Sequence, residues 1–202
     1  MTTFDELKRK SAWPPTSNGM PDLGDDYPDT LLWQYLTATE SLDGDLHSLA
    51  VNLARLSDKA IREYREANDG LTAFLRTPRG VEQLEGHTRL LQATDRLENC
   101  IDAIRRAEGF FKTAAFQRIT TRENREMLME LYGGARSIRN SIQHAEERIA
   151  KGLIPEGDPI YPAMTSDCLY FAGEYLPYAE VAALVIMMWQ LSSAGIKAVT
   201  TS

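Results

Sequence analysis

Apolar residues recur every three or four positions over most of this chain, which is the spacing that puts them on one side of an α-helix. The pattern predicts helices over residues 29–68, 81–112, 120–151 and 179–197. The last of these is apolar on nearly every side, as a helix in the centre of a bundle would be. We therefore expect an all-α, up-and-down helical bundle.

Residues 11–28 break this pattern because they are rich in proline and glycine, so residues 1–28 are interpreted as an extended N-terminal arm. Trp13 either anchors that arm or belongs to a flexible tail. Residues 29–68 form one long helix or two helices broken at Asp43-Gly44-Asp45. They carry a heptad-like stripe that serves either a helix hairpin within the bundle or a dimerisation arm: Leu32, Tyr35, Thr39, Leu42, Leu46, Leu49, Leu53, Leu56 and Ala60.

Asp69-Gly70 and Thr77-Pro78-Arg79-Gly80 predict a connector over residues 68–80 with at most a short helix. This divides the chain into the arm (1–28), a helical extension or hairpin (29–80) and a bundle (81–202). In the helix over 81–112, the residues expected to face the core are Leu84, Leu91, Leu97, Ile101 and Ile104. A small β-hairpin is expected around a turn at Ala172-Gly173, with Pro177 limiting its second strand to a sheet edge.

The helix over 120–151 begins at a capping-box pattern, Thr120-Thr121-Arg122-Glu123, and ends before Gly152 and Pro155. Gly133-Gly134 lies one turn before Arg136. This pair predicts a kink, the close approach of another backbone, or a break between two helices.

The second half of this helix combines an apolar stripe with a concentrated set of polar side chains. Ile138, Ile142, Ala145 and Ile149 share one side, and Arg136, Asn140, Gln143 and Glu147 lie opposite. Arg139 and His144 fall on the two borders of the polar face, roughly 140° apart. Side chains five positions apart do not meet on one helix. If the two act together, the simplest arrangement pairs them across a symmetric dimer.

The run Arg139-Asn140-Ser141-Ile142-Gln143-His144 resembles the R-N-x-x-x-H motif of the HEPN superfamily, and the resemblance covers residues 81–198. Members are compact helical bundles, commonly dimers. Many are metal-independent RNases of toxin–antitoxin or other defence systems, and others are inactive partner-binding or ligand-binding modules. The resemblance implies that Arg139 and His144 form a catalytic pair supported by Asn140. It also implies that an early helix brings Asp95, Glu98 or Asn99 near the motif.

RNA cleavage suits these residue types. Histidine can take a proton from a ribose 2′-hydroxyl, because its ordinary pKa lies close to neutrality. Arginine can stabilise the negative charge that develops on the phosphorus oxygens, and an amide can orient either group. The product would be a 2′,3′-cyclic phosphate, with no metal or other cofactor required. The residues expected to contact substrate are Arg136, Gln143, Glu147, Arg148, Asp95, Glu98 and Asn99. Taken alone, an arginine and a histidine on the polar side of a helix are more often ordinary solvated surface.

The net charge of −7 and the pI near 5.1 argue against a general nucleic-acid binder, so an RNase here would depend on local arginines. The two cysteines lie far apart and the first residues lack an apolar run, which predicts a reduced, cytoplasmic protein without a membrane anchor. Residue 146 is a glutamate where some toxins of the superfamily carry a modifiable tyrosine. That departure favours control by a protein or RNA antitoxin.

The leading hypothesis is a homodimeric endoribonuclease that cleaves RNA and is held in check by an antitoxin or a regulatory protein. The first alternative is a non-catalytic interaction or regulatory module of the same superfamily. The second is an unrelated bundle that binds a partner through the stripe from Leu32 to Ala60.

Overall fold

The computed structural model describes residues 19–38, 44–77, 83–113, 116–117 and 121–200. Within these residues, the chain is mostly helical and carries a small antiparallel sheet. In chain order the elements are α2 (Leu31–Ala38), α3 (Gly44–Arg76), α4 (Gln83–Phe111), α6 (Arg122–Gln143), α7 (Ala145–Ala150), β1 (Ala163–Met164), β2 (Cys168–Phe171), β3 (Glu174–Pro177) and α8 (Tyr178–Thr200).

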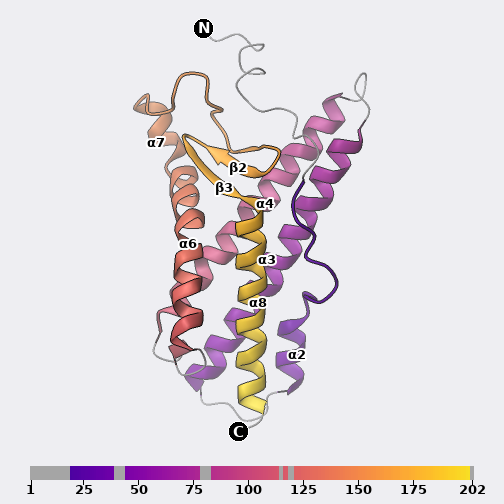
Figure 1. Ribbon diagram of the computed structural model, residues 1–202, viewed down its shortest axis with the longest axis vertical. Coiled ribbons are helices and arrows are strands. Elements are labelled where there is room, and N and C mark those ends of the chain that lie inside the picture. The colour runs from indigo at the N-terminus through magenta and orange to yellow at the C-terminus, as the bar shows by residue number, and fades with distance from the viewer. Residues whose placement is uncertain (1–18, 39–43, 78–82, 114–115, 118–120, 201–202) are drawn as a thin grey trace.

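The longest helices, α3 and α4, pack side by side as an antiparallel hairpin (Figure 1). Helix α8 runs through the middle of the molecule and contacts α2, α3, α4 and α6. Helix α6 lies on the opposite side of α8 from α2, and the sheet fills the space between the end of α6 and the α3–α4 hairpin (Figure 1). The central place of α8 confirms the prediction made from its apolar surface.

One hydrophobic core joins α3, α4, α6, the sheet and α8. Leu49, Leu53, Leu56 and Ala60 of the heptad-like stripe are all buried in it. The stripe therefore packs inside the bundle, which leaves its central leucines unavailable as a dimerisation or partner-binding face. Residues 39–43 between α2 and α3 lie outside the described residues.

The predicted connector at residues 68–80 is wrong over most of its length, because α3 continues through Asn68, Asp69 and Gly70 to Arg76. Gly70 lies where α3 packs closely against Ala93 of α4. A Cβ atom there would be 3.0 Å from the Cβ of Ala93. Close packing of the two helices outweighs the low helix propensity of glycine, which is about 1 kcal/mol below that of alanine.

The described part of the N-terminal arm, residues 19–28, has no helix or strand and lies against the bundle. Met20 and Leu23 are buried, and the hydroxyl of Tyr64 donates to the carbonyl of Pro21 at 2.8 Å. Trp189 of α8 donates its indole N–H to the carbonyl of Pro28 at 2.9 Å. The expected role of Trp13 lies outside the described residues.

Asp58 of α3 links the arm to the bundle at the start of α2. Its carboxylate accepts the backbone N–H groups of Leu31 and Leu32, both at 2.9 Å, so it caps α2 from a neighbouring helix. This long-range cap ties the position of α2 to α3.

The predicted β-hairpin is confirmed, with β2 and β3 joined by Ala172 and Gly173. Both turn residues have positive φ, 49° and 84°, as a two-residue hairpin turn of type I′ requires. Pro177 ends β3 at the sheet edge, as predicted. The sequence did not predict β1, which pairs with β2 through Ala163 and Met164.

Helix α6 begins at Arg122, close to the predicted capping box, of which Thr120 lies outside the described residues. The helix runs unbroken through Gly133-Gly134, and a Cβ atom on Gly134 would lie 3.1 Å from Leu176 Cδ1 and 3.0 Å from Glu180 Oε2. The glycine thus allows β3 and α8 to approach closely.

The predicted helix over 120–151 is interrupted at His144, which separates α6 from α7. Ile149 is 47% exposed, because the break turns α7 away from the line of the core stripe. Leu91 of α4 was also expected in the core and is 48% exposed. Of the helices described, none is long and apolar enough to cross a membrane.

Candidate functional site

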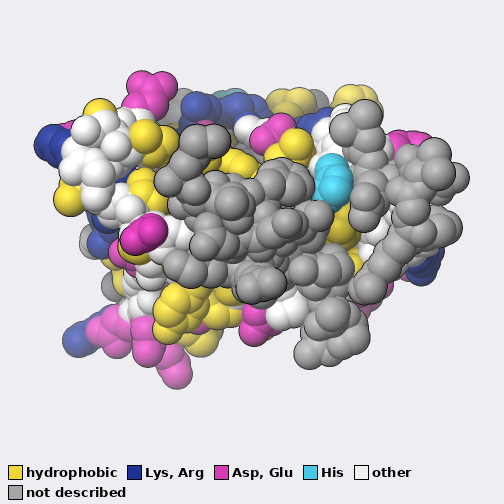
Figure 2. Space-filling model, turned by 90° about the horizontal axis from the view of Figure 1, so that it is seen from above, with side chains coloured by type: hydrophobic (Ala, Val, Ile, Leu, Met, Phe, Trp, Pro, Cys, Tyr) yellow, Lys and Arg dark blue, Asp and Glu magenta, His cyan; other side chains and the backbone are white. Residues whose placement is uncertain are grey.

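The end of the molecule that carries α7 and the sheet shows acidic and basic side chains interspersed around its rim (Figure 2). Helix α6 brings the motif residues to this end. Arg139 lies within α6 and His144 directly follows the last residue of that helix, and the two side chains face different neighbours.

Arg139 faces α4. Its Nη2 atom lies 3.0 Å from Oδ1 of Asp102, and the side chain is 22% exposed. Its guanidinium is therefore positioned by a carboxylate of the neighbouring helix, and only part of it reaches the surface.

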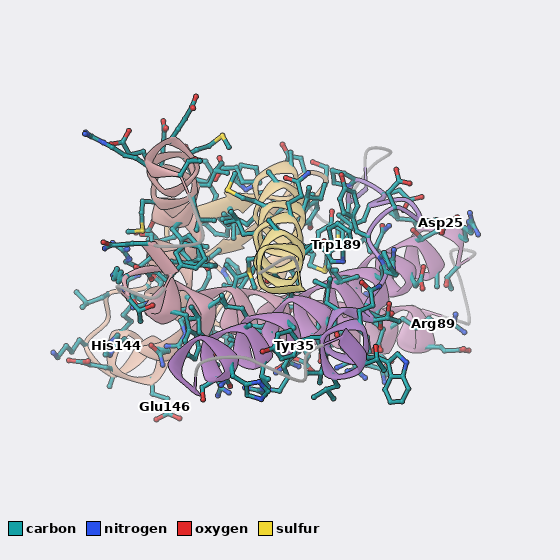
Figure 3. All side chains as sticks on the ribbon, turned by 90° about the horizontal axis from the view of Figure 1, so that it is seen from below. Asp25, Tyr35, Arg89, His144, Glu146 and Trp189 are labelled. Carbon is teal, nitrogen blue, oxygen red and sulfur yellow. The ribbon has the colours of Figure 1, made fainter. Side chains whose placement is uncertain are left out.

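His144 lies at the turn between α6 and α7, with a side chain that is 64% exposed. It projects at the edge of the molecule beside Glu146 (Figure 3). Its Nδ1 lies 3.4 Å from Oε2 of Glu147, one turn further along. A carboxylate in this position favours a proton on Nδ1, which leaves Nε2 as the proton acceptor of the neutral ring.

His144 lines an open cleft of about 350 Å³ between α6, α7 and the hairpin. The other residues lining it are Ser137, Asn140, Ser141, Glu147, Arg148, Leu153 and Glu174. Asn140 is exposed and shares this cleft with His144, whereas Arg139 does not line it. Arg148 is the cation in the cleft, and its Nη1 donates to the carbonyl of Ala172 at 3.2 Å.

Ser137 and Glu174 line the cleft but were not among the predicted site residues. The Ser137 hydroxyl donates to Oε2 of Glu174 at 2.8 Å, which ties α6 to β3. Ser137 lies seven positions before His144 and hence on the same side of the helix, which is a signal that the sequence offers. Glu174 comes from the hairpin, and no local pattern places it beside α6.

Arg136 faces α4 rather than the cleft and pairs with Glu108, whose side chain is fully buried. Arg105 and Lys112 pair with the same carboxylate. Burial alone would raise the pKa of Glu108, but hydrogen bonds from Lys112 and Arg136 and the charge of Arg105 outweigh it. The pKa of Glu108 therefore lies below its ordinary range, and the group is ionised at neutral pH.

The three candidate site residues on α4, which are Asp95, Glu98 and Asn99, do not all face α6. Glu98 lies one turn before Asp102, on the side that faces α6. Asn99 and Asp95 are exposed, and Asn99 is turned by about 100° from Glu98. Gln143, the last residue of α6, is also exposed. Glu98 is therefore the α4 candidate closest to the carboxylate that holds Arg139.

Burial and the charge of Asp95 raise the pKa of Glu98 to about 7. Below pH 4.5 the carboxyl of Glu98 is protonated in both the folded and the unfolded protein, so it has no effect on stability. As pH rises from 4.5 toward 7, the unfolded chain loses this proton while the folded protein keeps it, and the free energy of unfolding falls. We expect Glu98→Gln to raise the free energy of unfolding at pH 8 by roughly 1–2 kcal/mol, after allowance for solvent screening, and to have little effect at pH 4.5. Urea denaturation at both pH values measures this difference. An equal effect at the two values would contradict the raised pKa.

Among the described residues, no group of three or more His, Cys, Asp or Glu side chains is arranged to hold a metal ion. The fold and the site together define a helical bundle with a small antiparallel sheet, in which a histidine directly after the last residue of α6 lies beside a carboxylate. Comparisons with protein-family models, curated proteins and solved structures give no match to this chain.

Proposed function

We propose that this protein is a metal-independent endoribonuclease of HEPN type that acts as a homodimer. The observation that carries the proposal is the His144–Glu147 pair in the cleft at the end of α6. An exposed imidazole beside a carboxylate and flanked by an amide and an arginine has the groups that proton transfer next to a phosphate requires.

In this reaction, His144 accepts the proton of a ribose 2′-hydroxyl through Nε2 as that oxygen attacks the adjacent phosphorus. The bond between phosphorus and the 5′-oxygen breaks, the departing oxygen takes a proton from water, and the imidazolium afterwards returns its proton to the solvent. The products are a 2′,3′-cyclic phosphate and a 5′-hydroxyl end. Glu147 stabilises the imidazolium that forms after proton transfer. Asn140 lies in the same cleft and can donate its amide N–H to a phosphate oxygen.

The composite site accounts for the separation of Arg139 from His144 within one subunit. A two-fold axis beside the exposed face of α6 would bring Arg139 of one copy toward His144 of the other, because an isologous contact repeats the same surface on both sides. Arg139 then stabilises the charge that develops on the phosphorus oxygens. Arg148 already shares a cleft with His144, so it is the competing candidate for this role.

The second candidate function is a non-catalytic interaction or regulatory module of the same superfamily. The ion pair between Arg139 and Asp102 favours it, because a guanidinium engaged by a carboxylate has fewer donors left for a phosphate. Under either function, we propose that a protein or RNA antitoxin, or another regulatory partner in a defence system, binds this protein and controls it.

The test of the nuclease is incubation of the purified protein with one sequence made as RNA, as DNA and as 2′-O-methyl RNA, each with and without EDTA. We expect cleavage of the RNA alone, unaffected by EDTA, with cyclic-phosphate ends detected by mass spectrometry. If a folded dimer leaves a panel of structurally diverse RNAs intact, the nuclease proposal is contradicted and the interaction module becomes the preferred function.

A further inference from the structure

The surface where α4 meets α6 gathers positive charge on a chain that is acidic overall. Five cations share only two carboxylates, those of Asp102 and Glu108: Arg105 and Arg106 of α4, Lys112 directly after α4, and Arg136 and Arg139 of α6. Each carboxylate cancels one charge, so the cations outnumber the acids here even though acidic residues predominate in the whole sequence.

The two carboxylates hold the cations in place but cannot satisfy all of their donors. Two arginines and a lysine carry many more N–H groups than the single carboxylate of Glu108 has lone pairs. Glu108 is itself fully buried, whereas the side chains of Arg105, Arg136 and Lys112 are 35%, 40% and 59% exposed. Around Glu108 the negative charge therefore lies beneath the surface and the positive charge lies on it, whereas Asp102 and Arg139 are both partly exposed, at 27% and 22%.

The neighbouring charged groups mark the limits of this cationic surface. Arg122 and Glu126 at the start of α6 form their own pair at 2.7 Å and add no net charge. Glu98 and Asp95 lie one and two turns before Asp102 on α4, so acidic groups border the surface on that side. The positive surface thus extends along α6 from Arg136 toward Arg139, and His144 lies roughly 12 Å further along the helix axis from Arg136.

We propose that the cationic surface formed by Arg105, Arg106, Lys112, Arg136 and Arg139 binds the phosphate groups of a single RNA strand and leads that strand along α6 to the cleft of His144. The identity of the strand as RNA rests on the proposed function, whereas the binding of phosphodiesters follows from the charges alone. Arginines that are already positioned by the carboxylates of Asp102 and Glu108 lose little side-chain freedom when a phosphate oxygen arrives.

The test measures binding without cleavage, by the fluorescence anisotropy of a labelled 2′-O-methyl oligonucleotide of about a dozen residues, a length within the range of single-strand binding sites. The variant Arg106→Gln/Lys112→Gln removes the two most exposed cations of the surface, at 62% and 59%. Its control, Arg62→Gln/Arg89→Gln, removes the same charge from side chains that are 51% and 46% exposed. Arg89 lies at the opposite edge of the molecule from His144 (Figure 3).

We expect the first variant to bind roughly tenfold or more weakly, the low end for loss of charge-assisted hydrogen bonds. The slope of log affinity against log salt should become shallower by about 0.7 for each lost phosphate contact. The control should retain affinity within about twofold of the parent protein. Equal losses in the two variants, or no binding by the parent protein at low salt, would overturn the proposal.

Asp102→Asn gives a test in the opposite direction, because it removes one of the two carboxylates that offset the cations. Binding should become tighter, an outcome that general damage to the fold does not produce. Unchanged or weaker binding by a folded Asp102→Asn protein would count against the proposal. The probe lacks a free 2′-hydroxyl, so this assay measures binding independently of cleavage. Tight binding of the probe together with no cleavage of unmodified RNA would support the phosphate-binding surface and contradict the proposed nuclease activity.

Discussion

Replacement of His144 by alanine is expected to lower the rate of RNA cleavage by about 10²- to 10⁴-fold, which is the contribution of a positioned proton-transfer group. The fold should survive, because the side chain is 64% exposed and the carboxylate beside it, that of Glu147, is also at the surface. Single-turnover cleavage of a fluorescent RNA measures the rate, and thermal unfolding checks the fold. Glu146→Ala is the matched control, since Glu146 is exposed, neighbours His144 and does not line the cleft.

A composite site predicts that two inactive variants restore each other. Arg139→Ala and His144→Ala homodimers each lack one half of both sites, whereas a mixed dimer has one intact site. After subunit exchange in equal amounts, half of the dimers are mixed, so roughly a quarter of the parent activity should return. Activity that stays at the level of the separate variants would place both residues in the same subunit's site, or outside it.

Arg148→Ala distinguishes between the two candidate cations. If Arg139 acts across the dimer, loss of Arg148 should leave complementation between the Arg139 and His144 variants intact. If Arg148 stabilises the charged phosphate instead, its loss should remove cleavage while Arg139→Ala retains it. Either pattern is read from the same single-turnover assay.

Local patterns in the sequence predicted those parts of the fold that depend on neighbouring residues. The hairpin followed from the Ala172-Gly173 turn, and the central place of α8 followed from its apolar surface. Each of these features is set by periodicity or by turn chemistry within a short stretch.

The features that the sequence predicted wrongly or did not predict depend on contacts between distant segments. Gly70 signals a break locally, but the close approach of Ala93 keeps α3 helical there. The interruption at His144 removes Ile149 from the core stripe that an unbroken helix would have. No spacing along the chain could place Glu174 in the cleft, or bring Asp102 and Glu108 to Arg139 and Arg136, because these pairs join separate elements.

The buried carboxylate of Glu108 gives the largest expected effect on stability. Arg136→Met/Lys112→Met would leave it with Arg105 alone, and we expect the free energy of unfolding to fall by about 3–5 kcal/mol, the usual cost of leaving a buried charge without its partners. That is a large fraction of the total stability of an ordinary domain. Urea denaturation at pH 7 measures the loss. Arg122→Met/Glu126→Met, which removes an exposed pair, should cost less than about 1 kcal/mol.

Adding Glu108→Met to the double variant should recover most of the lost stability, because the charge that needed compensation is gone. The pH dependence of the free energy of unfolding provides an independent test. In the parent protein the pKa of Glu108 is lowered, so its contribution is present above pH 4.5, the value for the unfolded chain, and is lost as pH falls through the folded-state pKa. Without Arg136 and Lys112 the pKa of Glu108 should rise, so the double variant should lose less stability than the parent protein as pH falls below 4.5. Strictly additive effects of the three substitutions, with the same pH dependence throughout, would mean that the cations act independently of Glu108. In that case the carboxylate would not be what holds the cationic surface in place.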